Sequence, residues 1–458
     1  MSENFWDQVD NYRKEGIDPL RWIPTCSNEP DNELLKHVLG KVKRCNVKID
    51  TDWFDAFHYS EKKSPELTRR VFTFDGALEN EVMIHHALSL LQVHNEIGEE
   101  PLLLENTVIN FFKKFKSKVL LRKNTVSLTS HKESQFALLD YIQLHKGDKV
   151  GFSVATNSAT QIFDPMLNLD SEINSNIAMV RTIDHLNLLG CTSGYMLYPI
   201  YDASTENMLD KIRENLDKFT SRYNLGMEDY SSLKIGKPFF GNTALANTLK
   251  ELPVNYQQVE AGMQLIISNK LGMLSAFALF MLLQIDPSLY DRLNKTDIKI
   301  SDLFTARDQT LKSLGEPKFS LGRVISKYCP DFGTNFDKSE HIMAVYPVSS
   351  EGILAVKTLS MLTNSEIMVN EVPMLNDEIA KFVTSENLIS NSTIPANGCH
   401  LIIASSNVSN LIIDDLQKHN YEPFIIGYIA NKERPSVKYN TNVDTFMMPN
   451  FKLQNQVL

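Results

Sequence analysis

The stretch AGMQLIISNKLGMLSAFAL, residues 261–279, joins a short apolar strand to an apolar helix through one compact turn. Apolar residues alternate before the turn, and an almost unbroken apolar run follows Gly272. Such a turn can present backbone N–H groups and a helix N-terminus to a phosphate, or it can be a packed corner between two buried elements. One glycine and one lysine, Lys270, do not make a phosphate-binding fingerprint, so the residues alone favour the packed corner.

Strands and helices also alternate elsewhere in the chain. HKGDKVGFSVATN (145–157) predicts a strand that enters a loop near Asn157, because Val150, Phe152 and Val154 alternate. STENMLDKIRENLDKFTSRYNLG (204–226) predicts an amphipathic helix with capping residues at its start. Near the C-terminus the predicted order is strand, helix, strand, over CHLIIAS, NVSNLIIDDLQKHN and PFIIGYIA (399–405, 407–420 and 423–430). This alternation indicates a fold of α/β and α+β class.

Length and charge bound the class of protein. A chain of 458 residues exceeds one ordinary core, so we expect two or three domains, with an edge near residues 250–260 and a loop-rich segment over 314–341.

The formal charge of −10 argues against nucleic acid or an anionic membrane as a partner. Five scattered cysteines favour a reducing compartment. Because the N-terminus lacks a secretory pattern and no stretch would span a membrane, we expect a cytoplasmic protein.

The familiar short enzyme motifs are absent from the sequence. It contains no His-Glu-x-x-His, no Gly-x-Ser-x-Gly, no Walker lysine loop and no Gly-x-Gly-x-x-Gly. Any assignment of function therefore depends on the order of longer segments.

That order resembles selenophosphate synthetase (selenide, water dikinase), a member of the AIR synthase-like ATP-binding superfamily. The stretch 261–279 is similar to the turn that opens the family's second domain, with Lys270, Leu271 and Gly272 matching. The segment 152–192 is similar to the family's aspartate-bearing segment and keeps its spacing. Weaker similarities follow in the family's order at TCSNEPDNELLKHVL, KPFFGNTAL, VSSEGILAV, ANGCHLIIAS and PFIIGYIANKERPSVKY (25–39, 237–245, 348–356, 396–405 and 423–439).

The resemblance implies a two-domain AIR synthase-like fold. We expect an N-terminal extension over 1–105 with a reactive-loop-like segment and helices, an N-terminal domain over 106–255 and a C-terminal α+β domain over 256–458. Strands of the N-terminal domain would pair across a dimer to form a β-barrel. The implied partner is a second copy or an active relative, because unpaired strand edges need covering.

The resemblance also implies a site for ATP and Mg²⁺. Its candidate residues are Cys26 as the reactive cysteine, Asp164 as a metal ligand, and, for the cofactor, Asn157, Asp164, Asp184, Gly241, Lys270 and Gly272. The departures from the family fall on this chemistry, since aspartate positions of the family hold Asn157, His185 beside Asp184, Lys123-Asn124 and Pro347. Only Asp164 of that acidic set clearly remains, and Cys26 lacks the lysine that would lower the pKa of its thiol.

Three hypotheses follow for the function. The first is a degenerate, non-catalytic relative that acts by binding or by pairing with a partner and that holds ATP and Mg²⁺ or no cofactor. The second is an active selenide, water dikinase, in which acidic groups would converge at Asp164, Asp184 and Asp170. The third is a structural subunit of a larger assembly, which would expose a large apolar surface. In the first case we expect Phe240, Leu271 and Lys123 to fill the site.

Overall fold

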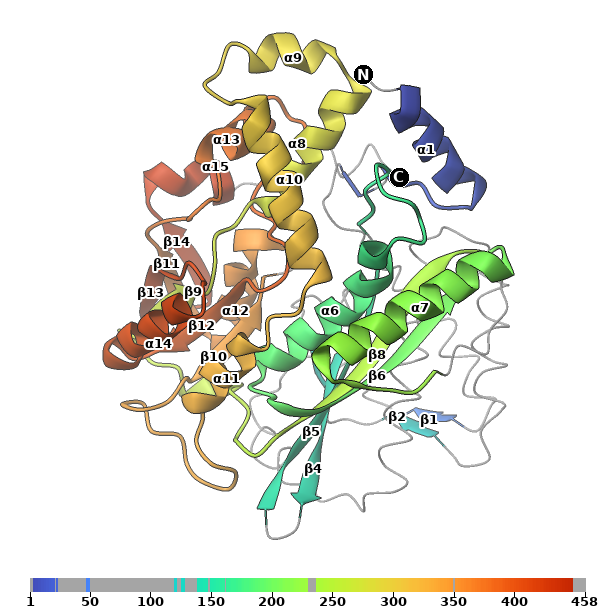
Figure 1. Ribbon diagram of the computed structural model, residues 1–458. Coiled ribbons are helices and arrows are strands. Elements are labelled where there is room, and N and C mark those ends of the chain that lie inside the picture. Colours follow the sequence, from blue (N-terminus) through green and yellow to red (C-terminus); the bar gives the residue numbers. More distant parts are fainter. Residues whose placement is uncertain are drawn as a thin grey trace.

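The computed structural model describes residues 3–20, 22–23, 47–49, 119–121, 125–127, 138–146, 149–160, 162–229, 236–348 and 351–447. Within these ranges the chain forms two six-stranded sheets with helices packed on and between them (Figure 1). A two-stranded parallel pair, β1 (Val47–Ile49) and β2 (Val119–Leu121), stands apart from both. The mixed α/β class predicted from the sequence is confirmed.

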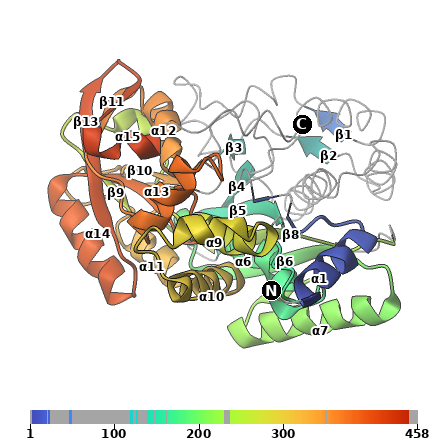
Figure 2. The ribbon, with the colours of Figure 1, turned by 90° about the horizontal axis from the view of Figure 1, so that it is seen from above.

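The first sheet has the order β3-β4-β5-β8-β6-β7, antiparallel except for the last pair. Its strands are β3 (Thr125–Ser127), β4 (Leu138–Lys146), β5 (Lys149–Ala159), β6 (Ser193–Asp202), β7 (Gly226–Met227) and β8 (Phe239–Thr248). Helix α6 (Glu172–Leu188) packs on β5 and β8, and α7 (Glu206–Tyr223) packs beside α6 (Figure 2). Over the described residues this sheet is open, with β3 and β7 at its edges, so the barrel formed with a partner stays a prediction.

The second sheet has the order β10-β12-β9-β13-β11-β14, again antiparallel except for the last pair. Its strands are β9 (Gln264–Ile267), β10 (Ala344–Pro347), β11 (Ser365–Val369), β12 (His400–Ala404), β13 (Phe424–Lys432) and β14 (Ser436–Tyr439). Helix α14 (Ser406–Lys418) packs on β9 and β12, while α12 (Ala355–Thr363) packs on β11 and β14. Short helical turns complete this half at η1 (Tyr256–Gln258), η2 (Gly352–Leu354), η3 (Thr441–Val443) and α15 (Asp444–Met447).

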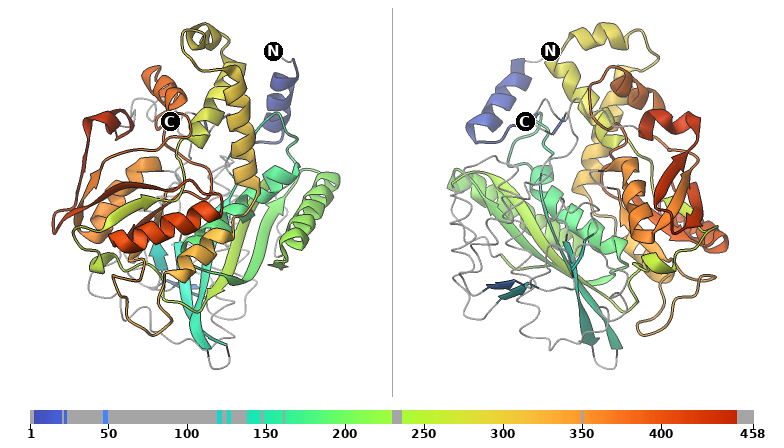
Figure 3. Two further views of the ribbon diagram at one scale, coloured as in Figure 1. Left: turned by 60° about the vertical axis from the view of Figure 1, so that its left-hand side comes forward. Right: turned by 180° about the vertical axis from the view of Figure 1, so that it is seen from behind.

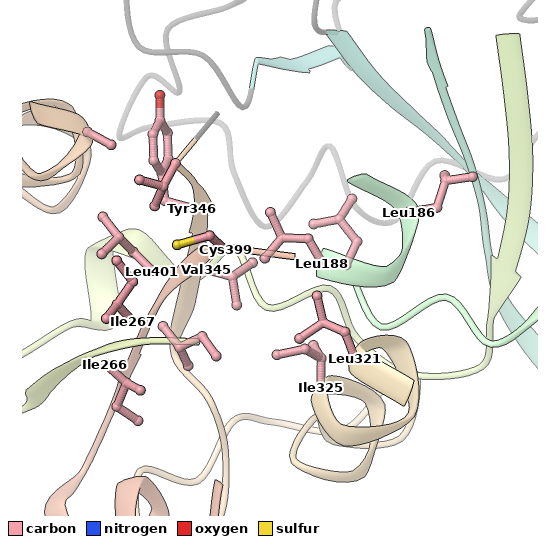
Figure 4. Close-up of a cluster of buried hydrophobic side chains, with 14 of the residues drawn as sticks. Leu186, Leu188, Ile266, Ile267, Leu321, Ile325, Val345, Tyr346, Cys399 and Leu401 are labelled. Atoms are coloured by element: carbon pink, nitrogen blue, oxygen red, sulfur yellow. The ribbon is translucent and has the colours of Figure 1, made fainter. Parts of the chain in front are cut away.

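A group of helices joins the two halves. Helix α10 (Ile300–Gly315) contacts both α6 and α8 (Met273–Ile285), as Figure 3 shows from two sides. With α9 (Ser288–Leu293), α13 (Asp377–Ser385) and the N-terminal α1 (Glu3–Lys14), these helices enclose one apolar core. A second core lies between the sheets, where α11 (Ser320–Lys327) meets the end of α6 and the strands of the second sheet (Figure 4).

The strongest sequence patterns became the elements that they predicted. The opening stretch forms β9 and α8, and α8 is buried almost all round because its sequence is apolar on every face. Helix α7 begins after Thr205, whose side chain accepts the Met208 N–H, and ends at Asn224 in the left-handed conformation. The C-terminal pattern gives β12, α14 and β13 in the predicted order.

Two details differ from the predictions. Strand β5 does not end near Asn157 but continues to Ala159, because Asn157 pairs with Thr243 of the long neighbouring strand β8. The segment 314–341 contains helix α11, whose buried apolar side chains pack against the end of α6. The Pro and Gly residues that marked a loop lie outside this helix, apart from Gly322, whose lack of a side chain permits close contact with the Cys191 carbonyl.

No helix in the described ranges has the length and apolar character needed to cross a membrane. The division at 105 and 255 stays a prediction. Cys26, Lys123 and Asn124 lie outside the described residues.

Candidate functional site

The turn after β9 is held by backbone bonds to residues 373–375. The Leu271 N–H donates to the Pro373 carbonyl at 2.9 Å, and the Leu271 carbonyl accepts the Leu375 N–H at 2.8 Å. Gly272 has a φ of +85°, and a Cβ added there would lie 2.5 Å from the Met374 Cε and 3.3 Å from the Ser392 carbonyl oxygen. The glycine therefore permits close packing of protein against protein.

The N-terminus of α8 is likewise engaged by the protein. The Leu274 N–H donates to the Ile394 carbonyl at 3.2 Å, so one of the free N–H groups of this helix end is already satisfied. Lys270 pairs with Glu422 at 2.5 Å, and its side chain is 28% exposed. These contacts favour the packed corner over a phosphate loop.

Asp184 lies in the C-terminal half of α6 and reaches the second sheet. Its Oδ2 accepts the Gly398 N–H at 2.9 Å and lies 3.0 Å from Nε2 of His400, the first residue of β12. The Nε2 contact falls outside hydrogen-bond geometry, and neither ring nitrogen of His400 has a hydrogen-bond partner in the described part of the chain. Ser268 completes the junction, because its hydroxyl donates to the Gly398 carbonyl at 3.0 Å and accepts the His400 N–H at 2.8 Å.

Burial and local charge set the protonation of this junction. Burial alone would raise the pKa of Asp184, but the His400 ring and the Gly398 N–H outweigh it and hold that pKa below its ordinary value. Burial lowers the pKa of His185 to about 3, and the positive charge of Arg181 adds to the effect. His185 is thus a neutral imidazole, with Nδ1 3.5 Å from the Thr156 hydroxyl of β5. Burial lowers the pKa of Lys318, and its ammonium lies over the Tyr421 ring at 5.3 Å.

Several predicted positions lie on strands that contact α6 or on the turn that bonds Gly398. Asn157 follows Thr156 on β5, and Pro347 is the register partner of His400 across β10 and β12. The turn that carries Lys270 begins at Ser268, which bonds Gly398. Gly241 lies in β8, opposite Ala159 and Ile200.

Asp164 lies elsewhere, in the turn before α6. Its side chain is fully buried, and its Oδ2 accepts Nε of Arg307 at 2.7 Å and Nη2 at 2.5 Å. Its Oδ1 accepts the Met166 N–H at 2.9 Å. Burial raises the pKa of the Asp164 carboxyl, and the Arg307 guanidinium opposes that rise. Both carboxylate oxygens are therefore occupied by protein donors.

The N-terminal segment holds this turn in place. The Tyr12 hydroxyl lies 2.9 Å from the Leu167 carbonyl and 3.3 Å from the Asp164 carbonyl, and it accepts Nδ2 of Asn174 at 2.9 Å. The Trp22 indole donates to the Phe163 carbonyl at 3.2 Å. Because Asn174 lies in the first turn of α6, Asp164 belongs to the N-terminal end of that helix.

The two acids do not converge on one point. Ten residues separate Asn174 from Asp184, which places the Asp184 end about 15 Å further along the helix axis. A magnesium ion needs several oxygen ligands within about 2.1 Å. Among the described residues no group of three His, Cys, Asp or Glu side chains could hold a metal ion, and the donor set at either acid does not fit Mg²⁺.

Sequence reasoning did not find the two residues that lie against these acids, Arg307 and His400. Arg307 lies on an amphipathic helix of mixed charge, and His400 begins an apolar strand. Each is remote in sequence from its acid, by 143 residues for Arg307 and Asp164. No local signal in a single sequence points to either pair.

The comparisons with known proteins bear on the fold. The sequence matches no family model and no curated protein. The structure is similar to thiamine-monophosphate kinase from Stenotrophomonas maltophilia, with 12% identity, 65% of this chain and 91% of that chain covered, and a TM-score of 0.46. It is also similar to a HypE-HypF complex, with 12% identity, 65% of this chain and 89% of that chain covered, and a TM-score of 0.46. A third similar structure is E. coli HypE, a hydrogenase maturation protein, with 14% identity, 63% of this chain and 81% of that chain covered, and a TM-score of 0.44. At these identities and TM-scores the neighbours single out no family for this chain.

Proposed function

We propose that this protein is a degenerate selenophosphate synthetase-like protein that does not catalyse phosphoryl transfer and acts by binding or by pairing with a partner. The observation that carries the proposal is the set of contacts made by Asp164, the one acid of the family's set that clearly remains, and by Asp184. Asp164 is held by Arg307, and Asp184 is held by His400 and the Gly398 N–H.

In phosphoryl transfer as the resembled family performs it, such carboxylates would hold magnesium ions. Magnesium ions bridge the phosphates of ATP and neutralise the charge that develops in the transition state. A carboxylate that already accepts a guanidinium or a backbone N–H has fewer lone pairs for a cation, and a fixed positive charge beside it repels one. The separation of the two acids along α6 adds a geometric obstacle, because bridging ions must lie within a few ångströms of each other.

The burial of two side chains that were expected to fill the site supports the same proposal. Phe240 and Leu271, two of the residues expected to fill it, are 3% and 0% exposed and belong to the core between the sheets. Pairing with a second copy or with an active relative is part of the proposal, because β3 is an edge strand of the first sheet.

An assay of selenide-dependent conversion of ATP to AMP tests the proposal. We expect no selenophosphate from the purified full chain in Mg²⁺, because losing even one transition-state contact costs about a hundredfold or more, and several are missing. A rate within about tenfold of an active family member would replace this proposal with the active dikinase.

A single back-substitution sharpens the assay. Asn157→Asp restores one acidic position but leaves Pro347, His185 and the Asp164–Arg307 pair unchanged. We therefore expect Asn157→Asp to be as inactive as the natural sequence. Recovery of activity by this one change would show that the remaining residues already form a working site.

A further inference from the structure

In the proposed function Arg307 serves only as the partner of Asp164, and no role of its own is assigned to it. Its side chain is 14% exposed and therefore reaches the surface, although the carboxylate that it binds is fully buried. The guanidinium lies 5.5 Å from the centre of the Phe280 ring. One face is thus backed by an aromatic ring, and one edge is fixed by Asp164.

The outward edge of the guanidinium keeps donors that Asp164 does not use. Asp164 takes Nε and Nη2, whereas Nη1 donates to Oδ1 of Asp308 at 3.1 Å. The Asp308 side chain is 71% exposed, so this second pair is a solvent-exposed one of small net stability. A ligand oxyanion could replace the Asp308 carboxylate at little cost, since arginine binds phosphate through parallel N–H donors.

Two residues that are linked to Asp164 or to Phe280 by contacts have exposed apolar side chains. Met166, whose N–H binds Asp164, is 46% exposed, and Phe304, one turn before Arg307 on α10, is 47% exposed. The Phe304 ring packs on Phe280 at 5.0 Å between centroids. A guanidinium that lies over Phe280, with the exposed Phe304 ring packed on the same phenylalanine, suits an organic molecule that carries an anionic group.

We propose that Arg307, oriented by Asp164, binds the phosphoryl group of an organic ligand without a divalent cation. Asp164 then positions an anion-binding arginine, where the family resemblance would have it hold Mg²⁺. The proposal rests on the proposed function, because it supplies the ligand class for a protein that binds and does not catalyse.

Calorimetric titration of the full chain with pyrophosphate in EDTA tests the site. We expect binding in EDTA that Mg²⁺ does not strengthen. Asp308→Asn should tighten pyrophosphate binding by about two- to fivefold, because it removes the competing carboxylate. Asp414→Asn, which makes the same change in net charge at an exposed position on α14, should leave the affinity unchanged.

Substitutions of Arg307 complete the test. Arg307→Lys keeps the charge but loses the fork of donors, and we expect pyrophosphate to bind about tenfold more weakly. Because Arg307→Gln alone leaves a buried carboxylate unpaired, it is made together with Asp164→Asn, and this double variant should lose binding. Natural affinity in the folded double variant, binding that requires Mg²⁺, or no binding by the natural sequence at millimolar pyrophosphate would each overturn the proposal.

The pyrophosphate titration and the selenophosphate assay can fail independently of each other. Production of selenophosphate together with Arg307-dependent pyrophosphate binding would overturn only the proposed function. Absence of both would overturn only the anion site.

Discussion

The two ends of helix α6 each bury an aspartate, but the groups that contact the carboxylate differ between the two ends. At the N-terminal end Asp164 meets a permanent cation, Arg307, which also reaches the surface. At the other end Asp184 meets an imidazole and a backbone N–H, with the His400 side chain only 3% exposed. One end therefore combines a fixed charge with access to solvent, and the other is a closed junction between the two sheets.

This difference suits one end of α6 to ligand binding and the other end to holding the two sheets together. A permanently charged guanidinium can hold its carboxylate and still offer donors to a ligand. An imidazole within a closed junction offers no such path, and its contacts with Asp184 tie α6 to β12. We infer that the Arg307 end binds a ligand and that the His400 end joins the two sheets.

The largest expected effect comes from breaking the Asp164–Arg307 pair on one side only. Arg307→Gln should lower the free energy of unfolding by about 3–5 kcal/mol at pH 7, because it leaves a buried carboxylate without its cation. The measurement is urea unfolding of the single variants and of the Asp164→Asn/Arg307→Gln double variant. The double variant should lose less stability than the sum of the singles, and simple additivity would contradict the direct pairing.

The second effect tests the closed end through pH. In the folded protein the pKa of His185 is about 3, against 6.5 for the free side chain. Below pH 6.5 the unfolded chain therefore binds a proton that the folded protein does not, and stability falls as pH falls. The loss that His185 contributes is about 1.4 kcal/mol per pH unit, or about 2 kcal/mol between pH 6.5 and 5.

The variant His185→Gln isolates this contribution. Its stability should depend on pH less steeply than that of the natural sequence over the same range, whatever its absolute stability. An unchanged slope would mean that His185 takes up a proton in the folded protein, and the closed character of this end would then be wrong.

The smallest expected effect concerns the N-terminal segment, which contacts the turn at Asp164. Tyr12→Phe removes the hydroxyl shared by Asn174 and the Leu167 carbonyl, and should cost about 1–2 kcal/mol. Tyr290→Phe is the control, because the Tyr290 hydroxyl has no hydrogen bond within the described ranges. Thermal unfolding of both variants compares them, and equal midpoints would show that Tyr12 does not tie α1 to the Asp164 turn.

Much of the fold could be predicted from local patterns. The stretch 261–279 gave β9 and α8, and the cap at Thr205 marked the start of α7, because period and capping are properties of neighbouring residues. Helix α11 was missed, since its short amphipathic pattern lies between Pro317 and Pro330 in a segment rich in turn residues. Packing against α6 stabilises this helix, and that contact is not visible in local sequence.

The candidate site could be predicted only in part. The resemblance identified Asp164 and Asp184 as acids of interest, and both are buried. It could not identify Arg307 or His400, because each pair forms between elements far apart in the chain. It also could not show that the two acids lie at opposite ends of α6, which depends on how the turn at Asp164 folds back on Tyr12.

Titration of the full chain with Mn²⁺, followed by electron paramagnetic resonance, tests the central claim most directly. Mn²⁺ takes the same oxygen ligands as Mg²⁺ and loses its free-ion signal when it binds. Since Arg307, His400 and the Gly398 N–H occupy the two carboxylates, we predict no stoichiometric Mn²⁺ binding at micromolar concentration. One tightly bound Mn²⁺ per chain that disappears in Asp164→Asn or in Asp184→Asn would contradict the account.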